Sequence, residues 1–359
     1  MIHPLEERIL YFLGHPKESE FEDLALEIHC YQRAHNAAFD RYCEFLGVPQ
    51  RLNSWREIPG VPQQAFKQTE LRSFAAAPEA VEFRTSGTTG EGFGRHLFPS
   101  LNLYDTAVQR GWDYFGLPRH EFVLLMQHPD DVPHSSLSRM GGVLSGFDKR
   151  AFFLTREGKL ELDRLKEHLL SRSAPVVLFG TALVFLNLFE QAPALNLSLP
   201  VGSIIMETGG FKGTGREIAK PDLYAQISAR FNLPISSIWN EYGMTELSSQ
   251  FYTSGVGQAH QAPPWMRFRV IEPNRNEEAA LGEIGLLRIF DLANLWSVLA
   301  VQTQDLAIAQ PAGGFLLLGR DPHALPRGCS RAVDEVIRTY AQGSGAFPTR
   351  HISEKSVPG

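Results

Sequence analysis

The sequence predicts an α/β protein whose mostly parallel sheets are covered by helices and followed by a small β subdomain. Between Glu121 and Gly243, apolar runs of strand length alternate with amphipathic stretches of helix length, as they do in βαβ units. After about Ala262, short strand-like runs follow one another with turns and no long helices between them. That second pattern is typical of a β subdomain.

The elements before the alternating region are predicted from periodicity and from Pro and Gly. Apolar positions at helical spacing over 21–46 indicate long amphipathic helices. Residues 56–71 are polar and interrupted by Pro, which predicts a connecting loop over the surface. Strands are expected at 81–86 and 95–100, around a glycine-rich turn, and a helix is expected over 101–116.

The remaining elements follow from the alternation itself. Strands are expected at 121–128, 150–155, 175–180, 202–210 and 236–243, with helices at 159–173, 182–191 and 221–232 between them. The strands of the β subdomain are expected at 266–273, 282–292, 297–309 and 314–320, and a short helix at 331–342 precedes a tail that looks disordered.

Composition narrows the class of protein. The chain has 359 residues, 43% hydrophobic content and a formal net charge of -6 without blocks of like charge, which argues against nucleic acid as the main partner. The three cysteines lie far apart, so neither a disulfide framework nor a structural zinc site is expected. The charged start of the chain is unlike a signal peptide, and the most apolar run, 174–189, is shorter than the roughly 20 residues of a membrane span. We therefore expect a cytoplasmic protein with no membrane span.

The glycine-rich stretch "RTSGTTGEGFGRHLF" has the composition of a phosphate-binding loop, because small residues let backbone N–H groups and hydroxyls converge on an anion. It does not match the P-loop pattern, since Phe93 and Gly94 stand where the lysine and the Ser or Thr would be. Arg95 likewise breaks the dinucleotide fingerprint. By itself the stretch is more readily explained as a β-hairpin turn, since predicted strands flank it on both sides. Its hydroxyl and glycine residues are Ser86, Gly87, Thr88, Thr89 and Gly90.

Two further groups of residues follow predicted parallel strands, where open α/β sheets bind ligands. Gly209 and Gly210 end one strand and offer bare backbone to a planar base, although a simple turn explains them too. In "NEYGMTELSSQ", Tyr242 can stack on a base, while Thr245 and Glu246 suit a phosphate and Mg²⁺. Thr245 as a helix cap beside a favourable acid is the alternative.

The β subdomain contributes a fourth group, in "VQTQDLAIAQPAGGFLLLGRD". Asp305 is a candidate acceptor for ribose hydroxyls, and Arg320 is a candidate donor to phosphate or ribose oxygens. An Asp between strands is ordinarily structural, so this group is weak alone. All four groups in this order resemble the adenylate-forming superfamily of acyl- and aryl-CoA synthetases. "IPGVPQQAFK", "ETGGFKGTGRE", "YGMTELSSQFY" and "DLANLWSVLAVQTQDLA" make the acyl-protein synthetase (LuxE-type) branch the most similar.

The resemblance implies a role for each motif residue. Ser86, Gly87, Thr88, Thr89 and Gly90 are expected to hold the ATP phosphates, and Gly209 and Gly210 to face adenine. Tyr242, with Gly243 beside it, is expected to stack on the base. Thr245 is expected to bond the α-phosphate and Glu246 to bind Mg²⁺. Asp305 is expected to hold the ribose, with Arg320 close by.

The function so implied is ATP-dependent activation of a fatty or aryl carboxylic acid to an acyl-adenylate, with release of pyrophosphate. The acyl group then passes to a thiol, which belongs to this chain, to a carrier protein, reductase or other acceptor protein, or to coenzyme A. The alternative is a catalytically weak nucleotide- or acyl-binding protein on the same scaffold. A Ser/His hydrolase is not indicated, because no G-x-S-x-G is present. The acid, the acceptor and the oligomeric state are left open.

The resemblance also exposes a departure. The predicted organisation is an adenylate-forming N-terminal domain over 1–320, with its β subdomain at about 262–320, and a truncated C-terminal segment over 321–359. Relatives carry a larger mobile domain with a catalytic lysine after this point. Arg95, Lys212 and Arg216 are the cations nearest the motifs and the candidates to replace it.

Cys329 is the candidate acyl acceptor, because in the LuxE-type branch a cysteine near the C-terminus takes the acyl group. Arg327 and Arg331 flank it, as a reactive thiol requires. A small buried cysteine that packs the tail is the alternative. The acid itself is expected between the sheet and residues such as Phe185 and Leu188, with His128 and His134 on a loop over it.

Overall fold

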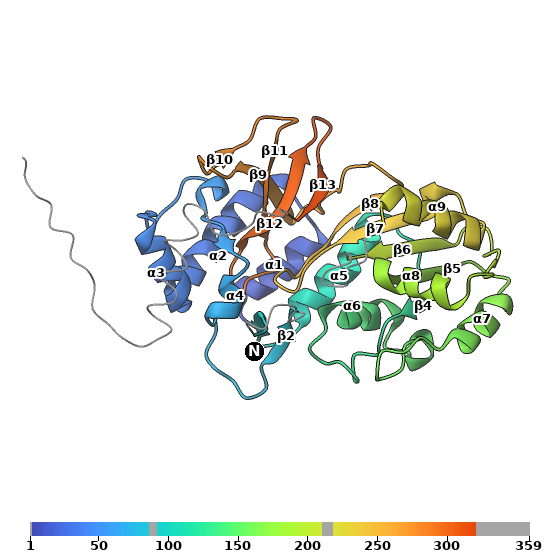
Figure 1. Ribbon diagram of the computed structural model, residues 1–359. Helices are drawn as coiled ribbons and strands as arrows, with labels where there is room; N and C mark the ends of the chain where they lie inside the picture. Colours follow the sequence, from blue (N-terminus) through green and yellow to red (C-terminus); the bar gives the residue numbers. More distant parts are fainter. Residues whose placement is uncertain (1, 86–91, 210–217, 321–359) are drawn as a thin grey trace, which may run out of the picture.

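A five-stranded sheet, a six-stranded sheet and a two-stranded hairpin organise the computed structural model over the residues that it describes, 2–85, 92–209 and 218–320 (Figure 1). In the five-stranded sheet the order is β4-β5-β6-β7-β8, and neighbouring strands are parallel except for β8, which is antiparallel to β7. These strands are β4 (Glu121–Leu125), β5 (Val176–Thr181), β6 (Ile204–Thr208), β7 (Ile238–Tyr242) and β8 (Phe251–Ser254).

Helices cover both faces of this sheet because its strands are apolar on both sides. Val123 and Leu125 face one core with α7 (Leu162–Leu170), α8 (Ala182–Gln191) and α9 (Lys220–Phe231). Phe122 and Leu124 point the other way, as alternation along a strand requires. They join a larger core that also includes residues of α5 (Asn102–Tyr114) and α6 (Ser136–Ser145).

The N-terminal helices confirm the helical periodicity over 21–46. They are α1 (Pro4–Gly14), α2 (Phe21–His35) and α3 (Ala37–Phe45), with a 3₁₀ turn, η1 (Glu18–Glu20), before α2. Asn36 separates α2 from α3, because its side chain accepts a hydrogen bond from the Phe39 N–H and caps the second helix. No helix in the described ranges is long and apolar enough to cross a membrane.

The four strands expected after Ala262 are present as β9 (Met266–Glu272), β11 (Ile284–Asp291), β12 (Ala300–Ala309) and β13 (Phe315–Arg320). The short strand β10 (Glu277–Glu278), which was not expected, and β1 complete the six-stranded sheet. The order is β1-β12-β11-β9-β10, and β13 pairs with β12. The register places Asp305 directly opposite Arg320. The domain boundary at 320 remains a prediction, and the tail after it lies outside the described residues.

The prediction of a surface loop over 56–71 is wrong. This segment contains η2 (Trp55–Glu57), β1 (Val61–Pro62) and α4 (Ala65–Gln68), and β1 pairs in parallel with β12. Ile58, Val61 and Phe66 are buried in the main core. The prolines suggested a loop, but a proline is tolerated on an edge strand such as β1, and the apolar residues between the prolines decide the burial.

Two other local predictions need correction. Residues 150–155 form the 3₁₀ turn η3 (Lys149–Ala151) and isolated bridges from Phe152 and Leu154 rather than a strand. The loop expected to carry His134 continues into helix α6, which begins where Ser135 accepts a hydrogen bond from the Ser138 N–H. The two glycines inside this helix led to the prediction of a loop, because glycine is a poor helix former.

Candidate functional site

A cavity of about 610 Å³ lies at the carboxyl ends of β5, β6 and β7. The hairpin of β2 (Val81–Arg84) and β3 (Arg95–Phe98) and the helices α5 and α6 form its other sides. This is the edge at which parallel α/β sheets bind ligands, because the strands end there and loops with polar groups begin. The described residues that line it are Arg84, Thr85, Phe93, Tyr104, His134, Ser135, Ser136, Leu137, Met140, Thr181, Thr208, Gly209, Glu241, Gly243, Met244, Thr245 and Gln250.

Several residues predicted from the sequence lie in this cavity, and others do not. Gly209, Gly243 and Thr245 line it. Residues 86–90, Gly210, Lys212, Arg216 and Cys329 lie outside the described residues, although Thr85 and Phe93 on either side of the glycine-rich stretch line the cavity. The residues that line it do not include Arg95, Tyr242, Glu246, Asp305 or Arg320.

Tyr242 links the end of β7 to the six-stranded sheet. Its ring is buried against Phe251 and Phe315, and its hydroxyl donates a hydrogen bond to Oδ2 of Asp305 at 2.7 Å. Burial and the neighbouring Asp305 carboxylate raise the pKa of Tyr242 well above its ordinary value. Nε of Arg320 lies 3.8 Å from Oδ1 of Asp305. Three predicted site residues are therefore in one contiguous group.

The turn that carries Thr245 and Glu246 is held from behind by β3. Nδ1 of His96 donates to the Thr245 carbonyl at 2.8 Å, and Nε2 accepts from the Ser297 hydroxyl at 2.9 Å. Burial lowers the pKa of His96 to about 4, which keeps the ring neutral and able to play both roles. His96 thereby fixes the backbone of the turn without contributing a charge.

The segment after β11 holds the same turn at a second point. Nδ2 of Asn294 donates to the Glu246 carbonyl at 2.9 Å, and the Ser248 hydroxyl donates to Oδ1 of Asn294 at 2.7 Å. Asp291 accepts hydrogen bonds from the N–H groups of Ser248 and Ser249 at 3.0 and 2.8 Å. The "DLANLW" stretch is thus a structural support for the turn.

Arg95 is one of the cations expected to take the role of the lysine that relatives carry. Its Nε lies 2.8 Å from Oε2 of Glu82, and its side chain is half exposed. Arg84, which lines the cavity, pairs with the same carboxylate. Although partial burial of Glu82 opposes ionisation, the two guanidinium groups hold its pKa below the ordinary range. Each arginine at this edge is therefore engaged in the described structure.

The expected position of the acid-binding pocket needs revision. Phe185 and Leu188 are fully buried in the core beneath α8 and do not line the cavity. His134 does line it, and its carbonyl accepts a hydrogen bond from the Arg84 N–H at 2.9 Å. His128 instead lies in the core, where its Nδ1 accepts from the Asp130 N–H.

Sequence reasoning missed Glu241, Thr208, Gln250 and Arg84 as cavity residues. The signal for Glu241 is strand alternation, because side chains next to each other along β7 point to opposite faces. Asn240 and Tyr242 point toward His260 and Asp305, so Glu241 between them points toward the cavity. Gln250 and Arg84 have no comparable signal, since their positions depend on how separate segments pack.

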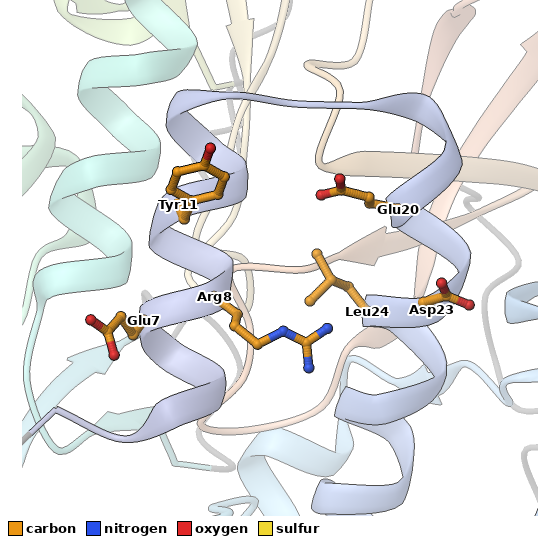
Figure 2. Close-up of a pocket in the computed structure, with 6 residues that line it drawn as sticks. All are labelled: Glu7, Arg8, Tyr11, Glu20, Asp23 and Leu24. Atoms are coloured by element: carbon orange, nitrogen blue, oxygen red, sulfur yellow. The ribbon is translucent and has the colours of Figure 1, made fainter.

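Another cavity, of about 350 Å³, lies between the N-terminal helices (Figure 2). Most of its side chains are charged and exposed, and Arg8 pairs with Glu27 beside it. No residue of the sequence motifs lines it, and within the described ranges no group of three His, Cys, Asp or Glu side chains is placed to hold a metal. It is lined by Glu7, Arg8, Tyr11, Glu20, Asp23 and Leu24.

Comparisons with solved structures confirm the adenylate-forming fold. ATP-bound MatB from Rhodopseudomonas palustris superposes with a TM-score of 0.51 at 18% identity over 67% of this chain and 47% of that one. An ATP-bound RpMatB-BxBclM chimera gives the same TM-score and coverage at 19% identity. The chain thus spans about half the length of the solved structures it matches. At this identity the likeness concerns the fold.

Comparison of sequences identifies the family. The long-chain-fatty-acid–luciferin-component ligase of Aliivibrio fischeri is 23% identical over 97% of this chain and 94% of its own length. The family model of the acyl-protein synthetase LuxE matches residues 14–337, which is most of the chain and includes every motif discussed above. The protein therefore belongs to the LuxE family of acyl-protein synthetases and is an enzyme of the acid–thiol ligase type.

Proposed function

We propose that this enzyme activates a carboxylic acid with ATP to an acyl-adenylate, releases pyrophosphate and passes the acyl group to a thiol. The observation that carries the proposal is the convergence of three motif segments on one cavity. Thr85 flanks the glycine-rich stretch, Gly209 follows β6, and Thr245 follows β7, and all three line the 610 Å³ cavity. A nucleotide and an acid bound there would meet between the strand ends and the hairpin.

The nucleotide is assigned to the motif residues. Residues 86–90 would hold the ATP phosphates, and Gly209 and Gly210 would lie against the adenine. Gly209 supports the placement of adenine at this edge of the sheet. Its φ of +75° favours glycine, and an added Cβ would meet nothing within 4 Å, so the space beside its backbone is open. Tyr242 and Gly243 would border the base, and Asp305 with Arg320 would take the ribose hydroxyls.

Magnesium is assigned to Glu246, with phosphate oxygens of the substrate as its other ligands. One carboxylate beside a phosphate suits this ion, which keeps several waters and prefers substrate oxygens to an all-protein cage. When bound, the ion would neutralise charge on the phosphates. The protein holds Glu246 in place through the hydrogen bond from Asn294 to its carbonyl.

The first step depends on how the acid and ATP are positioned, and not on proton transfer. An oxygen of the acid attacks the α-phosphorus, the bond from that phosphorus to the bridging oxygen breaks, and pyrophosphate leaves. A carboxylate is already ionised near pH 7, so no general base is required. The Thr245 hydroxyl would donate a hydrogen bond to the α-phosphate. The hydrogen bonds from His96 and Asn294 to the backbone of the turn hold Thr245 in position.

In the second step, a thiolate attacks the acyl carbon and AMP leaves. Cys329, a carrier protein, a reductase or other acceptor protein, and coenzyme A are the candidate sources of that thiol. Cys329 would need a lowered pKa, which Arg327 and Arg331 on either side of it in the sequence would favour.

A catalytically weak binding protein is the second candidate function. The observation in its favour is that Arg84 and Arg95 are both paired with Glu82. Neither is then available as a cation for the leaving pyrophosphate unless it changes partner. Lys212 and Arg216 remain candidates for that role.

Acid-dependent ATP–pyrophosphate exchange tests the first step. A panel of fatty and aryl acids is supplied with Mg-ATP, and at least one acid is expected to support exchange. Glu246→Gln is expected to lower the rate by about a hundredfold or more, since it weakens a charge-stabilising ligand. Glu167→Gln, at an exposed position of α7, is the matched control and should leave the rate unchanged. Nucleotide binding without exchange for any acid would favour the second candidate instead.

Trapping of a labelled acyl group tests the second step. If Cys329 is the acceptor, label bound to the protein is lost in Cys329→Ser and kept in Cys30→Ser, which changes an exposed cysteine of α2. Label that survives the change at Cys329 assigns the acceptor thiol elsewhere.

A further inference from the structure

The cavity wall formed by the end of β7 is polar, although an acyl chain would be expected to meet an apolar surface. Glu241 and Thr208 are 5% and 6% exposed, and both line the cavity with Gln250. The Thr208 hydroxyl donates a hydrogen bond to Oε2 of Glu241. In the described part of the chain no cation is paired with Glu241, and burial of an unpaired acid is costly, so this arrangement requires an explanation.

Glu241 and Gln250 converge above the backbone of Gly243. A Cβ built on Gly243 would stand 2.4 Å from Oε1 of Glu241 and 3.4 Å from Cγ of Gln250. A side chain at this position would therefore displace the carboxyl group. The glycine lets the two polar groups share one spot on the cavity wall.

One acceptor at this spot lacks a partner within the described residues. Oε1 of Gln250 is buried there without a hydrogen bond. At Glu241 beside it, the described hydrogen bond is the one that Oε2 accepts from Thr208. Buried polar atoms in folded proteins are nearly always hydrogen-bonded, so a donor from a bound molecule is the natural partner here.

This wall belongs to the side of the cavity away from the assigned ribose site. Asn240 and Tyr242, on the opposite face of β7, are engaged by His260 and Asp305. The face of Glu241 is completed by Tyr104 of α5 and by Leu137 and Met140 of α6. A chain lying there would have an aromatic and aliphatic wall on one side and the polar spot on the other.

We propose that the acid activated by this enzyme carries a hydroxyl or amino group, which donates hydrogen bonds to Glu241 and Gln250. The inference rests on the proposed function and names the substrate class of that same cavity. A plain alkyl or aryl acid would leave Oε1 of Gln250 buried and unpaired. Sites built around a hydrogen bond reject analogues that lack the donor far more strongly than apolar pockets reject a shorter chain.

Matched acids test the substrate class. Hydroxy- and amino-substituted aliphatic and aryl acids are compared with their unsubstituted parents, by ATP–pyrophosphate exchange and by calorimetric binding without ATP. We expect at least one substituted acid to exceed its parent by about a hundredfold in kcat/KM for exchange, and to bind correspondingly tighter.

Variants of Glu241 assign the preference to this spot. Glu241→Leu is expected to remove the preference, because KM for the substituted acid rises toward KM for its parent. Glu241→Gln keeps hydrogen-bonding capacity and is expected to retain most of the preference. Circular dichroism and thermal unfolding verify that each variant is folded, and Gln250→Leu provides an independent variant on the same spot.

The two readouts separate the inference from the function on which it rests. Exchange that is equally fast with every substituted acid and its parent overturns the inference and leaves the adenylation proposal standing. Selective binding without exchange for any acid overturns adenylation and leaves the polar subsite standing. A preference that persists in both Glu241→Leu and Gln250→Leu places its origin elsewhere and overturns the inference.

Discussion

Glu207 and Glu241 are neighbouring buried acids whose surroundings differ. Burial raises the pKa of Glu207, while Lys220, with Nζ 3.6 Å from Oε2, and hydrogen bonds from Tyr224 and Asn240 oppose that rise. Burial raises the pKa of Glu241 to about 7, opposed by the Thr208 hydroxyl and increased further by the nearby charge of Glu207. Among the described residues, Glu207 has a cation as its partner and Glu241 has none, which suits a structural role for Glu207 and a ligand-facing role for Glu241.

The raised pKa of Glu241 predicts a pH-dependent stability. A carboxyl whose pKa is higher in the folded protein than in the unfolded chain binds more protons when folded. Its contribution to the free energy of unfolding is therefore lost as the pH rises from its ordinary pKa of 4.5 to about 7. Over that window the loss is on the order of 3 kcal/mol. Glu241→Gln, which cannot ionise, should not show it.

Urea unfolding of wild type and Glu241→Gln from pH 4.5 to pH 8 measures this difference. The variant is expected to gain stability relative to wild type as the pH rises through the window that ends at the pKa of about 7. A constant difference between the two proteins at every pH would show that Glu241 keeps an ordinary pKa.

At the scale of elements, strand pairing in the six-stranded sheet depends on Gly285. In the pairing of β11 with β9, an added Cβ on Gly285 would lie 2.6 Å from the carbonyl oxygen of Ile271, a backbone atom that cannot move aside cheaply. Gly111 in α5 differs, because an added Cβ would meet Tyr252 and Trp265 at 3.8 and 3.9 Å, which is ordinary contact. Replacement of glycine by alanine should therefore change the free energy of unfolding in opposite directions at these two positions.

Gly285→Ala is expected to lower the free energy of unfolding by about 1–3 kcal/mol, because the strands must separate locally. Gly111→Ala is expected to raise it by about 0.5–1 kcal/mol, because alanine is the better helix former and the site has room. Thermal and urea unfolding of both variants measure these changes. Loss of stability in Gly111→Ala would mean that α5 packs more tightly than this geometry allows.

At the scale of the whole molecule, α2 is joined to the turn after β11, far along the sequence. The Gln32 side chain is fully buried, and its Nε2 donates to the carbonyls of Asn294 and Leu295 at 2.9 and 3.1 Å. Its Oε1 accepts from the Leu299 N–H at 2.9 Å. Since Asn294 in turn holds the Glu246 carbonyl, the N-terminal helices support the turn at the cavity.

Gln32→Leu keeps the volume of the side chain but leaves three backbone groups without this partner. We expect the free energy of unfolding to fall by on the order of 3 kcal/mol, and KM for ATP to rise if the turn loses its position. Gln109→Leu, at an exposed position of α5, is the matched control for added apolar surface. Stability equal to wild type in Gln32→Leu would mean that water or another side chain replaces the three hydrogen bonds of Gln32.

The sequence by itself determined the α/β class, the order of most strands and helices, and the family, because these depend on local periodicity and on motifs that are contiguous in the chain. Strand alternation also predicts that Glu241 points to the face of β7 opposite Tyr242. Local sequence signals gave wrong predictions where helix- or strand-breaking residues occur inside an element. Prolines in 56–71 led to a predicted loop in place of β1 and α4, and two glycines led to a predicted loop in place of α6.

The tertiary structure decided which residues share the cavity. Gln250, Arg84 and Tyr104 come from separate segments, and their meeting depends on how β8, the β2–β3 hairpin and α5 pack. It also decided that Tyr242 and Asp305, remote in the sequence, are hydrogen-bonded at 2.7 Å. Such contacts are made by long-range packing, which no window of sequence contains.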